Sequence, residues 1–323
     1  MPPNSRSRHI WRLRTRSVEL GVRTVVMGIL NVTPDSFSDG GRFFAQDKAA
    51  DHALRMLDEG ADLIDIGGES TRPGSTAISP PEEQARVLPV VRQVLAARSG
   101  AILSIDTYHA ETARMAVEEG VEIVNDVSGH LWDPEMAATC SALGCGNVLM
   151  HTRGRPSEWR TQPRLAADEV LPLVLRGLRA RADAALAAGI ARETIVLDPG
   201  FGFGKIMDEN LPLLASFAEL CSLGFPLLAG LSRKSFLARL RERTHPSLVI
   251  PQRSTLAADA EESASLPVAQ IGSEIGPDLA TSAANMAALL AGAHILRVHE
   301  VGPARQVAGI ADRLLAAANS SHS

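Results

Sequence analysis

The sequence predicts an α/β protein that folds as a single-domain (β/α)8 TIM barrel. Short apolar runs alternate with amphipathic stretches along nearly the whole chain, which is typical of parallel strands joined by helices. The alternation gives eight such units, the number that closes a barrel. The runs are apolar at successive positions, as in strands that are covered on both faces. Together these observations favour a closed barrel over an open sheet.

The predicted strands are short apolar runs that are each followed by polar or glycine-rich residues. The first runs from Thr24 to Leu30 and turns polar at Asn31, so the strand should end there and a loop should begin. The eight strands span residues 24–30, 63–67, 101–106, 122–125, 147–150, 194–197, 226–231 and 294–298.

The predicted helices are the amphipathic stretches between these strands. Ser79, followed by two prolines and two glutamates, has the residue order of a helix start, and Pro303 suits a first helical turn. No sequence repeat relates the units, which excludes a solenoid. The helices span residues 45–59, 81–98, 110–119, 133–143, 168–188, 209–222, 234–242, 279–290 and 303–317.

The chain divides into an extension, a barrel and a tail. Residues 1–23 are rich in arginine and lack a long apolar run, so we expect a flexible N-terminal extension. Residues 24–317 should form the barrel and residues 318–323 a C-terminal tail. The seventh unit is far longer than a helix and its turns require, and residues 242–277 show weak periodicity. We interpret this segment as an insertion after the seventh strand.

The composition excludes several classes of function. A formal net charge of −5 gives no reason to expect a nucleic acid or a membrane as partner. No apolar run has the length of a transmembrane helix, and the first residues lack the apolar segment of a secretory signal. We therefore expect a cytoplasmic protein. Three cysteines without a CxxC motif indicate reduced thiols in preference to a metal site.

Lysine is scarce in this arginine-rich chain, which contains only Lys48, Lys205 and Lys234. Lysine offers a compact ammonium on a flexible stem, so a lysine retained in such a chain suggests a position that needs one. Lys205 and Lys234 both lie in glycine- or serine-rich turns after predicted strands. Both are therefore candidates for a functional site.

Polar side chains stand at or just after the end of every predicted strand. In a barrel these positions and the loops that follow them surround one pocket. A single strand-end Asp is by default a helix cap, but caps alone do not explain polar residues at all eight strands. The candidates are Asn31, Asp65, Asp106, Asn125, His151, Asp198, Lys234, Arg297 and His299.

One group of these residues suits a flat heterocycle that carries ring N–H and amino groups. Asp106 and Asp198 supply hydrogen-bond acceptors, Asn125 supplies an amide and Lys234 an ammonium. A site built on such hydrogen bonds discriminates strongly between ligands, because the wrong ligand leaves buried polar groups unpaired.

A second group suits an anion. Arg297 and His299 alternate along one strand, so both should face the pocket. With the helix that begins near Pro303 they predict an anion site at the eighth strand, where barrels commonly bind phosphate. Asn31 offers a neutral oxygen to a Mg²⁺ that substrate phosphates and water otherwise hold. The alternative for His299 is an ordinary surface histidine.

Seven motifs resemble those of the bacterial dihydropteroate synthases, in the same order, over about residues 25–301 apart from the insertion. The resemblance implies a barrel enzyme of folate biosynthesis. Such an enzyme condenses 6-hydroxymethyl-7,8-dihydropterin diphosphate with 4-aminobenzoate to give 7,8-dihydropteroate and diphosphate. The resemblance also implies Mg²⁺ as cofactor, a homodimer, and sulfonamides as competitive inhibitors. The motifs are MGILNVTPDSFSDGG, DIGGESTRPG, SIDTY, NDVSG, DPGFGFGK, GLSRKSF and HILRVH.

The same resemblance implies a role for each matching residue, with the loops at residues 33–41 and 70–74 closing over the pocket. The pterin would be held by Asp106, Asn125, Asp198 and Lys234, with Asp65 supporting the pocket. The diphosphate would be bound by Asn31, Thr71, Arg297 and His299, and Asn31 would contact the Mg²⁺. The 4-aminobenzoate site would be lined by Phe37, Thr71, Arg72, Pro73, Phe203, Lys234 and Ser235, with Ser232 close by.

Two other functions remain open. A pterin-dependent methyltransferase of the same superfamily would share Asp106, Asn125 and Asp198, but would have no use for an anion site at Arg297 and His299. A catalytically silent pterin-binding paralogue would show degraded loop motifs, whereas both loop motifs are intact here. One departure from the family is the histidine that follows SIDTY, at a position where the family more often has a basic or small residue. The insertion also lies near the surface through which the family dimerises.

Overall fold

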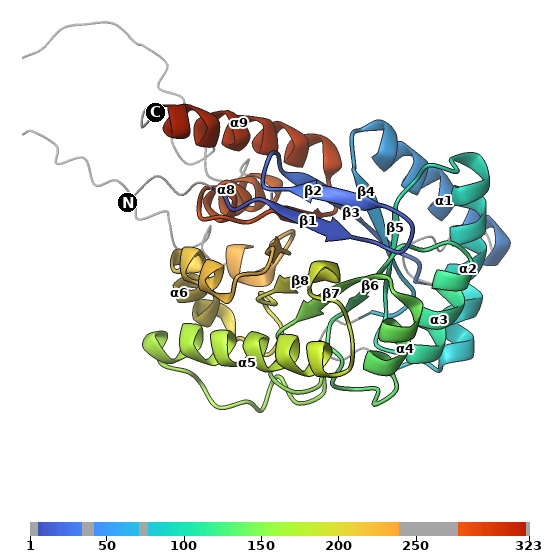
Figure 1. The fold of residues 1–323 in the computed structure, drawn as a ribbon, viewed down its shortest axis with the longest axis horizontal. Coiled ribbons are helices and arrows are strands. Elements are labelled where there is room, and N and C mark those ends of the chain that lie inside the picture. The colour runs from blue at the N-terminus through green and yellow to red at the C-terminus, as the bar shows by residue number, and fades with distance from the viewer. Residues whose placement is uncertain (1–5, 34–41, 71–76, 239–276, 321–323) are drawn as a thin grey trace, which may run out of the picture.

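Eight parallel strands form the centre of the structure, which is a computed structural model that describes residues 6–33, 42–70, 77–238 and 277–320 (Figure 1). Along the sheet, β3 to β8 pair in sequence order, and β10 lies between β3 and β9. A parallel bridge between Leu197 and Leu227 joins β8 to the residues before β9, which closes the barrel. The strands are β3 (Val25–Asn31), β4 (Leu63–Gly67), β5 (Leu103–Asp106), β6 (Ile123–Asp126), β7 (Gly146–Met150), β8 (Ile195–Asp198), β9 (Leu228–Ala229) and β10 (Ile295–Val298).

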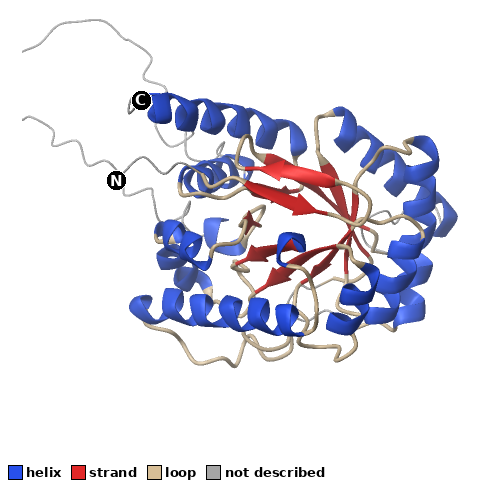
Figure 2. Cartoon of the chain, in the orientation of Figure 1, coloured by secondary structure: helices blue, strands red, loops and turns tan. Residues whose placement is uncertain are grey.

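Helices surround the strands, as the blue ribbons around the red arrows in Figure 2 show. The predicted cap at Ser79 is confirmed, because its Oγ accepts the backbone N–H of Glu82 at 3.4 Å and prolines occupy the first turn. The α-helices are α1 (Arg42–Asp58), α2 (Pro80–Ala97), α3 (Ala110–Glu118), α4 (Met136–Leu143), α5 (Ala167–Ala187), α6 (Asn210–Ala215), α8 (Pro277–Leu290) and α9 (Val301–Ser320). Short 3₁₀ helices are η2 (Arg192–Thr194), η3 (Met207–Glu209) and η4 (Phe217–Leu223).

The apolar core has two layers. The larger one lies between the barrel and its helices and includes Ile64 and Val90, both fully buried. The smaller one fills the inside of the barrel, where Met27 and Val148 contribute fully buried side chains. Alternate residues of one strand enter the two layers, as expected when both faces of a strand are covered.

A hairpin at the N-terminus completes the inner layer. β1 (His9–Arg12) pairs antiparallel with β2 (Ser17–Leu20), and Trp11 is fully buried in the cluster that also contains Met27 and Val148. The Trp11 indole donates to the carbonyl of Thr194 at 2.9 Å. For the described part of the flexible extension that we expected at residues 1–23, the hairpin is a correction. The hairpin is ordered because Trp11 and its neighbours close the inner apolar layer at the amino ends of the strands.

Three smaller differences from the expected elements have local causes. The seventh strand is reduced to β9, and Pro226 at its expected start has no N–H for the ladder. The helix expected at residues 209–222 is broken into α6 and η4 at Ser216, whose φ is −102°. The last helix, α9, continues through residues 318–320 of the expected tail. The expected insertion at 242–277 lies outside the described residues except for its last position, Pro277, which begins α8.

None of the helices in the described ranges is long and apolar enough to cross a membrane.

Candidate active site

Four strand-end side chains form one hydrogen-bonded cluster at the carboxyl ends of the barrel strands. The Arg297 guanidinium, from β10, donates from Nε to Asp65 Oδ2 at 2.6 Å and from Nη2 to Asp106 Oδ2 at 2.5 Å. Asn125 Nδ2 donates to the same oxygen of Asp65 at 2.8 Å. The cluster thus joins β4, β5, β6 and β10. The strand-end residues meet at one place, as the barrel prediction requires.

Arg297 contacts different residues from the one with which the sequence grouped it. We grouped it with His299 as an anion site, but in this structure it bridges two carboxylates of the heterocycle group. Burial lowers the pKa of Arg297, but the charges of Asp65 and Asp106 outweigh this effect and raise it. Arg297 is therefore a fixed cation that faces two negative groups.

Asp106 has a raised pKa, because burial outweighs the charge of Arg297. Burial raises its pKa to about 7 in spite of Arg297, whose single positive charge is shared with Asp65. Asp65 is fully buried, and its second oxygen, Oδ1, has no hydrogen-bond partner among the described residues. An unpaired buried acceptor of this kind is a position where a ligand N–H group gains a strong hydrogen bond.

Asp198 and Lys234 form a second pair of charged groups, close enough to Arg297 to interact with its charge. The backbone N–H of Gly200 donates to Asp198 Oδ1 at 2.7 Å, and burial raises the pKa of this carboxyl. Burial likewise lowers the pKa of Lys234 to about 8, while the charge of Asp198 opposes the shift. The Lys234 ammonium lies 4.2 Å from the ring centre of Phe203, in a cation–π contact.

The glycine-rich turn after β8 makes this contact possible. Gly202 has a φ of +81°, and a Cβ atom there would lie 3.3 Å from Cδ of Lys234. Trp159 packs edge-on against Phe203, with ring centres 5.2 Å apart. Phe203 and Lys234, which the sequence assigned to the same aromatic-acid site, are thus in contact.

Ser232, in the loop after β9, makes two hydrogen-bond contacts with His299. Its Oγ lies 2.9 Å from His299 Nδ1 and accepts the His299 backbone N–H at 3.2 Å. The hydroxyl can donate to Nδ1 or accept from it, depending on the tautomer of the imidazole. Ser232, which the resemblance assigned to the 4-aminobenzoate site, thus contacts His299, which the sequence placed in the predicted anion site. Ser235 is exposed in the next helical turn.

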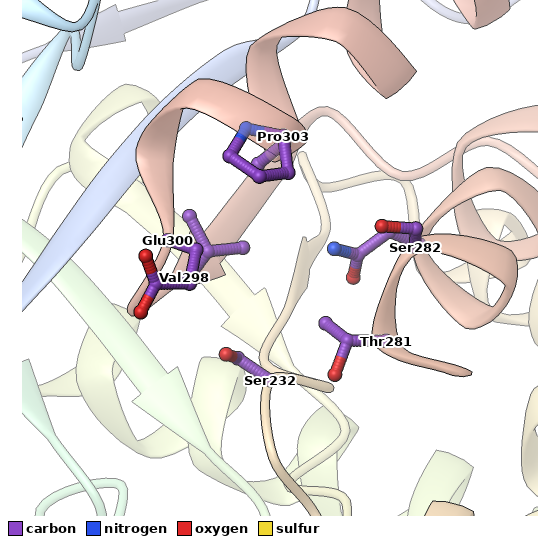
Figure 3. Close-up of a pocket in the computed structure, with 8 residues that line it drawn as sticks. Ser232, Thr281, Ser282, Val298, Glu300 and Pro303 are labelled. Carbon is purple, nitrogen blue, oxygen red and sulfur yellow. The ribbon is translucent and has the colours of Figure 1, made fainter. Parts of the chain in front are cut away.

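A small cavity lies behind Ser232, between β10 and the amino ends of α8 and α9 (Figure 3). Its volume is about 10 Å³, which is the room that one water molecule needs. Thr281 and Glu300 line it, and so does Asn285, a buried residue whose Oδ1 has no partner within the described part of the chain. The cavity is polar and too small for a substrate.

Lys205 and His151 form a buried pair beside this site. The sequence indicated both as candidate functional residues but assigned no role to either. Lys205 Nζ lies 3.0 Å from His151 Nδ1 and donates to the carbonyl of Phe203 at 3.2 Å. Burial lowers the pKa of Lys205 to about 7. Gly177 in α5 gives the imidazole its space, because a Cβ there would lie 2.4 Å from His151 Cδ2. The scarcity of lysine was the signal that pointed to Lys205.

The remaining candidates are only partly described. Asn31 stands half-buried at the carboxyl end of β3, beside Gly67 of β4. The expected loop residues Phe37, Thr71, Arg72 and Pro73 lie outside the described residues, as does most of the loop at 33–41.

The fold and this pocket define a (β/α)8-barrel protein with a polar small-molecule site at the carboxyl ends of its strands. The chain matches the family described as pterin binding enzyme over residues 27–299. It is 38% identical to the dihydropteroate synthase of Synechocystis over 295 residues, which cover 91% of each chain. The chain therefore belongs to the pterin-binding enzyme family, and within it to the dihydropteroate synthases.

Two solved structures are similar throughout. One is a dihydropteroate synthase from Xanthomonas albilineans with 4-aminobenzoic acid, with a TM-score of 0.79 and 37% identity, covering 96% of this chain and 99% of that one. The other is the Yersinia pestis dihydropteroate synthase in a sulfonamide drug complex, with a TM-score of 0.77 and 36% identity, covering 95% and 99%.

Proposed function

We propose that the protein condenses 6-hydroxymethyl-7,8-dihydropterin diphosphate with 4-aminobenzoate, and releases 7,8-dihydropteroate and diphosphate. The observation that carries the proposal is the cluster of Asp65, Asp106, Asn125 and Arg297 in a barrel of the dihydropteroate synthases. The similar Xanthomonas protein binds 4-aminobenzoic acid, which supports the choice of the second substrate.

The pterin ring would lie among the side chains of Asp106, Asn125, Asp198 and Lys234. Its ring N–H and amino groups would donate to Asp106 and Asp198, and its carbonyl and ring nitrogens would accept from Lys234 and Asn125. Asp65 Oδ1, buried and without a partner among the described residues, is a further acceptor. Burial makes these hydrogen bonds selective, because a ligand that fails to make them leaves polar atoms unpaired.

The leaving diphosphate would lie at the anion site. His299, whose Nδ1 lies 2.9 Å from Ser232 Oγ, would donate from Nε2 in the tautomer in which Nδ1 accepts from the hydroxyl. Arg297 precedes His299 by two positions, so both side chains face the same way. It would add positive charge as the CH₂–O bond breaks. For this it must share its charge between Asp106 and the diphosphate, which the high pKa of Asp106 makes easier.

Mg²⁺ is part of this proposal. Asn31 offers one neutral oxygen, and Arg297 engages the carboxylates of Asp65 and Asp106. Such a donor set suits a Mg²⁺ that is bound largely through diphosphate oxygens and water, with Asn31 as one ligand. When bound, the ion would supply positive charge to the leaving group.

The 4-aminobenzoate ring would lie near Phe203 and Lys234, with its amine toward the pterin carbon. An aromatic amine is neutral near pH 7 and attacks without deprotonation by the protein, so no protein nucleophile is required. We also infer that the protein works as a homodimer in the cytoplasm, and that sulfonamides occupy the 4-aminobenzoate site, because the similar Yersinia protein binds a sulfonamide drug.

A product assay tests the proposal. Purified protein is mixed with dihydropterin diphosphate, Mg²⁺ and labelled 4-aminobenzoate, and labelled dihydropteroate is measured by chromatography. We expect product in this mixture and none when the pterin carries a free hydroxyl in place of the diphosphate. Asp198→Asn serves as an inactive control with the same side-chain volume. Binding of the pterin without product would favour a silent paralogue, and methyl transfer from a folate would favour a methyltransferase.

A further inference from the structure

We propose that Lys205 is a positioning residue for the 4-aminobenzoate site, because its side-chain nitrogen holds the backbone carbonyl of Phe203 in the turn that presents the Phe203 ring. This role rests on the proposed function, which places 4-aminobenzoate beside Phe203. Lys205 Nζ donates to the carbonyl at 3.2 Å, and only 3% of the lysine is exposed. The lysine therefore acts on the site through Phe203 and not by touching the substrate.

The turn that carries Phe203 does not set its own shape. Phe203 stands between Gly202 and Gly204, whose φ angles are +81° and +68°. Glycine adopts such left-handed angles without strain, but it also leaves the backbone more conformations than any other residue does. The position of the Phe203 ring therefore depends on contacts from outside the turn.

Three side chains make such contacts at different points of the turn. Asn210 accepts the Gly202 N–H at 2.7 Å and donates to the Lys205 carbonyl at 3.1 Å. Arg153 Nη1 donates to the Gly204 carbonyl at 3.1 Å. Among the described residues, the contact from Lys205 is the one side-chain hydrogen bond to the backbone of Phe203 itself.

Lys205 is held by three acceptors. Its Nζ lies 3.0 Å from His151 Nδ1, 3.4 Å from the His151 carbonyl and 3.2 Å from the Phe203 carbonyl. A protonated lysine has three N–H groups and no acceptor, so in this form it donates to all three, with Nδ1 as an acceptor. The match between donors and acceptors sets the direction of the N–H that Phe203 accepts.

His151 is itself tightly packed. Its backbone N–H donates to the Asp198 carbonyl at 2.9 Å, which continues the pairing of β7 with β8. A Cβ atom on Gly200 would lie 2.1 Å from the His151 carbonyl oxygen, and one on Gly177 of α5 would lie 2.4 Å from His151 Cδ2. The two acceptors that His151 offers to Lys205 are therefore fixed to the barrel wall.

The Phe203 ring carries this position to the substrate pocket. The ring centre lies 4.2 Å from Lys234 Nζ and 5.2 Å from the ring centre of Trp159. A shift of the Phe203 backbone would displace the ring against which 4-aminobenzoate should lie. The strand-end residues that would hold the pterin keep their own contacts. Loss of the Lys205 contact should therefore affect one substrate much more than the other.

A general base is the competing interpretation of a buried lysine whose pKa burial lowers to about 7. A base must lie within hydrogen-bond reach of the proton that it removes. Lys205 Nζ instead contacts His151 and the Phe203 carbonyl, and a neutral aromatic amine attacks without a base. Burial beside neutral acceptors also accounts for the lowered pKa. The contacts therefore favour a positioning role.

Steady-state kinetics of Lys205→Met tests the proposal. The change removes the N–H groups and keeps most of the side-chain volume. We expect the KM for 4-aminobenzoate to rise about tenfold, the equivalent of about 1.4 kcal/mol, as for the loss of one hydrogen bond. The KM for dihydropterin diphosphate and kcat should change less than about twofold. The pterin site should be little affected, because Lys234 and Arg297 act on the charge of Asp198 more strongly than Lys205 does.

A matched control separates position from stability, because Lys205→Met should also lower Tm. Glu122 is a buried charged residue that directly precedes β6, and it accepts the Nε–H of Arg16 at 3.1 Å. Glu122→Gln weakens this contact at the amino ends of the strands, opposite the active site. We expect it to lower Tm and to leave both KM values unchanged.

Two variants of His151 keep the proposal testable if Lys205→Met does not fold. His151→Asn places an amide oxygen near the position of Nδ1, whereas His151→Leu has nearly the same shape as His151→Asn and no acceptor. We expect the KM for 4-aminobenzoate to rise in His151→Leu and to stay closer to that of the unchanged protein in His151→Asn.

The outcomes are distinguishable. An unchanged KM for 4-aminobenzoate in folded, active Lys205→Met overturns the positioning role and leaves the proposed function intact. An equal rise of both KM values with a lower Tm overturns it too, since that would mean a purely structural role. A loss of kcat alone would support the general base instead. Equal KM values in the two His151 variants would contradict the support of Lys205 by Nδ1. Absence of product from the unchanged protein overturns the proposed function and the inference together.

Discussion

Ser232 and His299 are joined twice, once through the imidazole and once through the backbone. The Ser232 oxygen lies 2.9 Å from Nδ1 of His299 and 3.2 Å from its backbone nitrogen. The serine comes from the loop after β9 and the histidine directly follows β10, so the pair ties two neighbouring strand ends. It fixes the orientation of the imidazole and so the direction in which Nε2 points.

The first prediction concerns this pair. Ser232→Ala frees the imidazole, so the KM for dihydropterin diphosphate should rise about fivefold, as expected for one lost hydrogen bond of about 1 kcal/mol. The KM for 4-aminobenzoate should change little. Steady-state kinetics with each substrate varied in turn measures both. A rise confined to the KM for 4-aminobenzoate would instead support the assignment of Ser232 to the 4-aminobenzoate site.

Arg297→Met should reduce both turnover and stability. Removal of the guanidinium leaves Asp65 and Asp106 as unpaired buried carboxylates, and the loss of one partner from a buried pair costs about 3 kcal/mol or more. Protonation relieves this penalty, so the stability loss should be smaller at pH 5 than at pH 8. Denaturant unfolding at the two pH values measures it. An equal loss at both would mean that Asp106 does not change its protonation state between the two pH values.

The pH dependence of pterin binding should follow Lys234. Burial lowers its pKa to about 8, below the value in the unfolded chain, so the folded protein releases this proton first. The unfolded state therefore binds more protons above pH 8, and this group contributes a stability that rises from there to about pH 10.5. Binding has the opposite sign, because a neutral amine donates more weakly.

The KM for dihydropterin diphosphate should accordingly rise above pH 8. Lys234→Met should remove both pH effects while keeping much of the packing on Phe203. Kinetics and thermal unfolding between pH 7 and pH 10.5 measure them. A pH profile that Lys234→Met leaves unchanged would assign the titration to another group.

The N-terminal hairpin should determine stability without affecting catalysis. Trp11→Ala removes a fully buried indole and its hydrogen bond to Thr194, which should lower the free energy of unfolding by about 3–5 kcal/mol. Both KM values should stay the same, because the hairpin closes the end of the barrel opposite the active site. Ile10→Ala, at a neighbouring side chain that is 54% exposed, is the matched control and should cost less than about 0.5 kcal/mol.

Sulfonamides should compete with 4-aminobenzoate and not with the pterin. Initial rates at several concentrations of each substrate distinguish the two patterns, since a competitive inhibitor raises KM and leaves kcat unchanged. Full turnover at a saturating sulfonamide concentration would contradict the assignment of this site.

The barrel was predictable because each of its strands is short, apolar and followed by polar residues. β4, at Leu63–Gly67, was predicted residue by residue, since Gly67 and Gly68 mark its end. The helix at residues 209–222 was not, because the chain breaks at Ser216 within a pattern that is amphipathic overall. The hairpin at β1 and β2 was missed because its strands have only four residues each, and the turn between them carries the exposed residues Arg14 and Arg16.

The site was predictable as a set of residues, and less so as a set of contacts. Polar residues at the strand ends identified Asp106, Asn125 and Asp198, because a closed barrel brings strand ends together. Their spacing does not reveal that Arg297 bridges Asp65 and Asp106, since a long side chain reaches several neighbours. The contact between Lys205 and the Phe203 carbonyl lies in a glycine-rich turn whose path only the folded backbone determines.

The lowered pKa of Lys234 also has a consequence for covalent chemistry. Near neutral pH a larger fraction of this amine is unprotonated than of an ammonium in water, and it lies against the Phe203 ring where an aromatic acid should bind. An aromatic compound that carries an aldehyde or a sulfonyl fluoride would thus be held beside a reactive amine. Lys205, the other lysine with a low pKa, is buried against His151. Such a reagent would therefore label Lys234 in preference to Lys205.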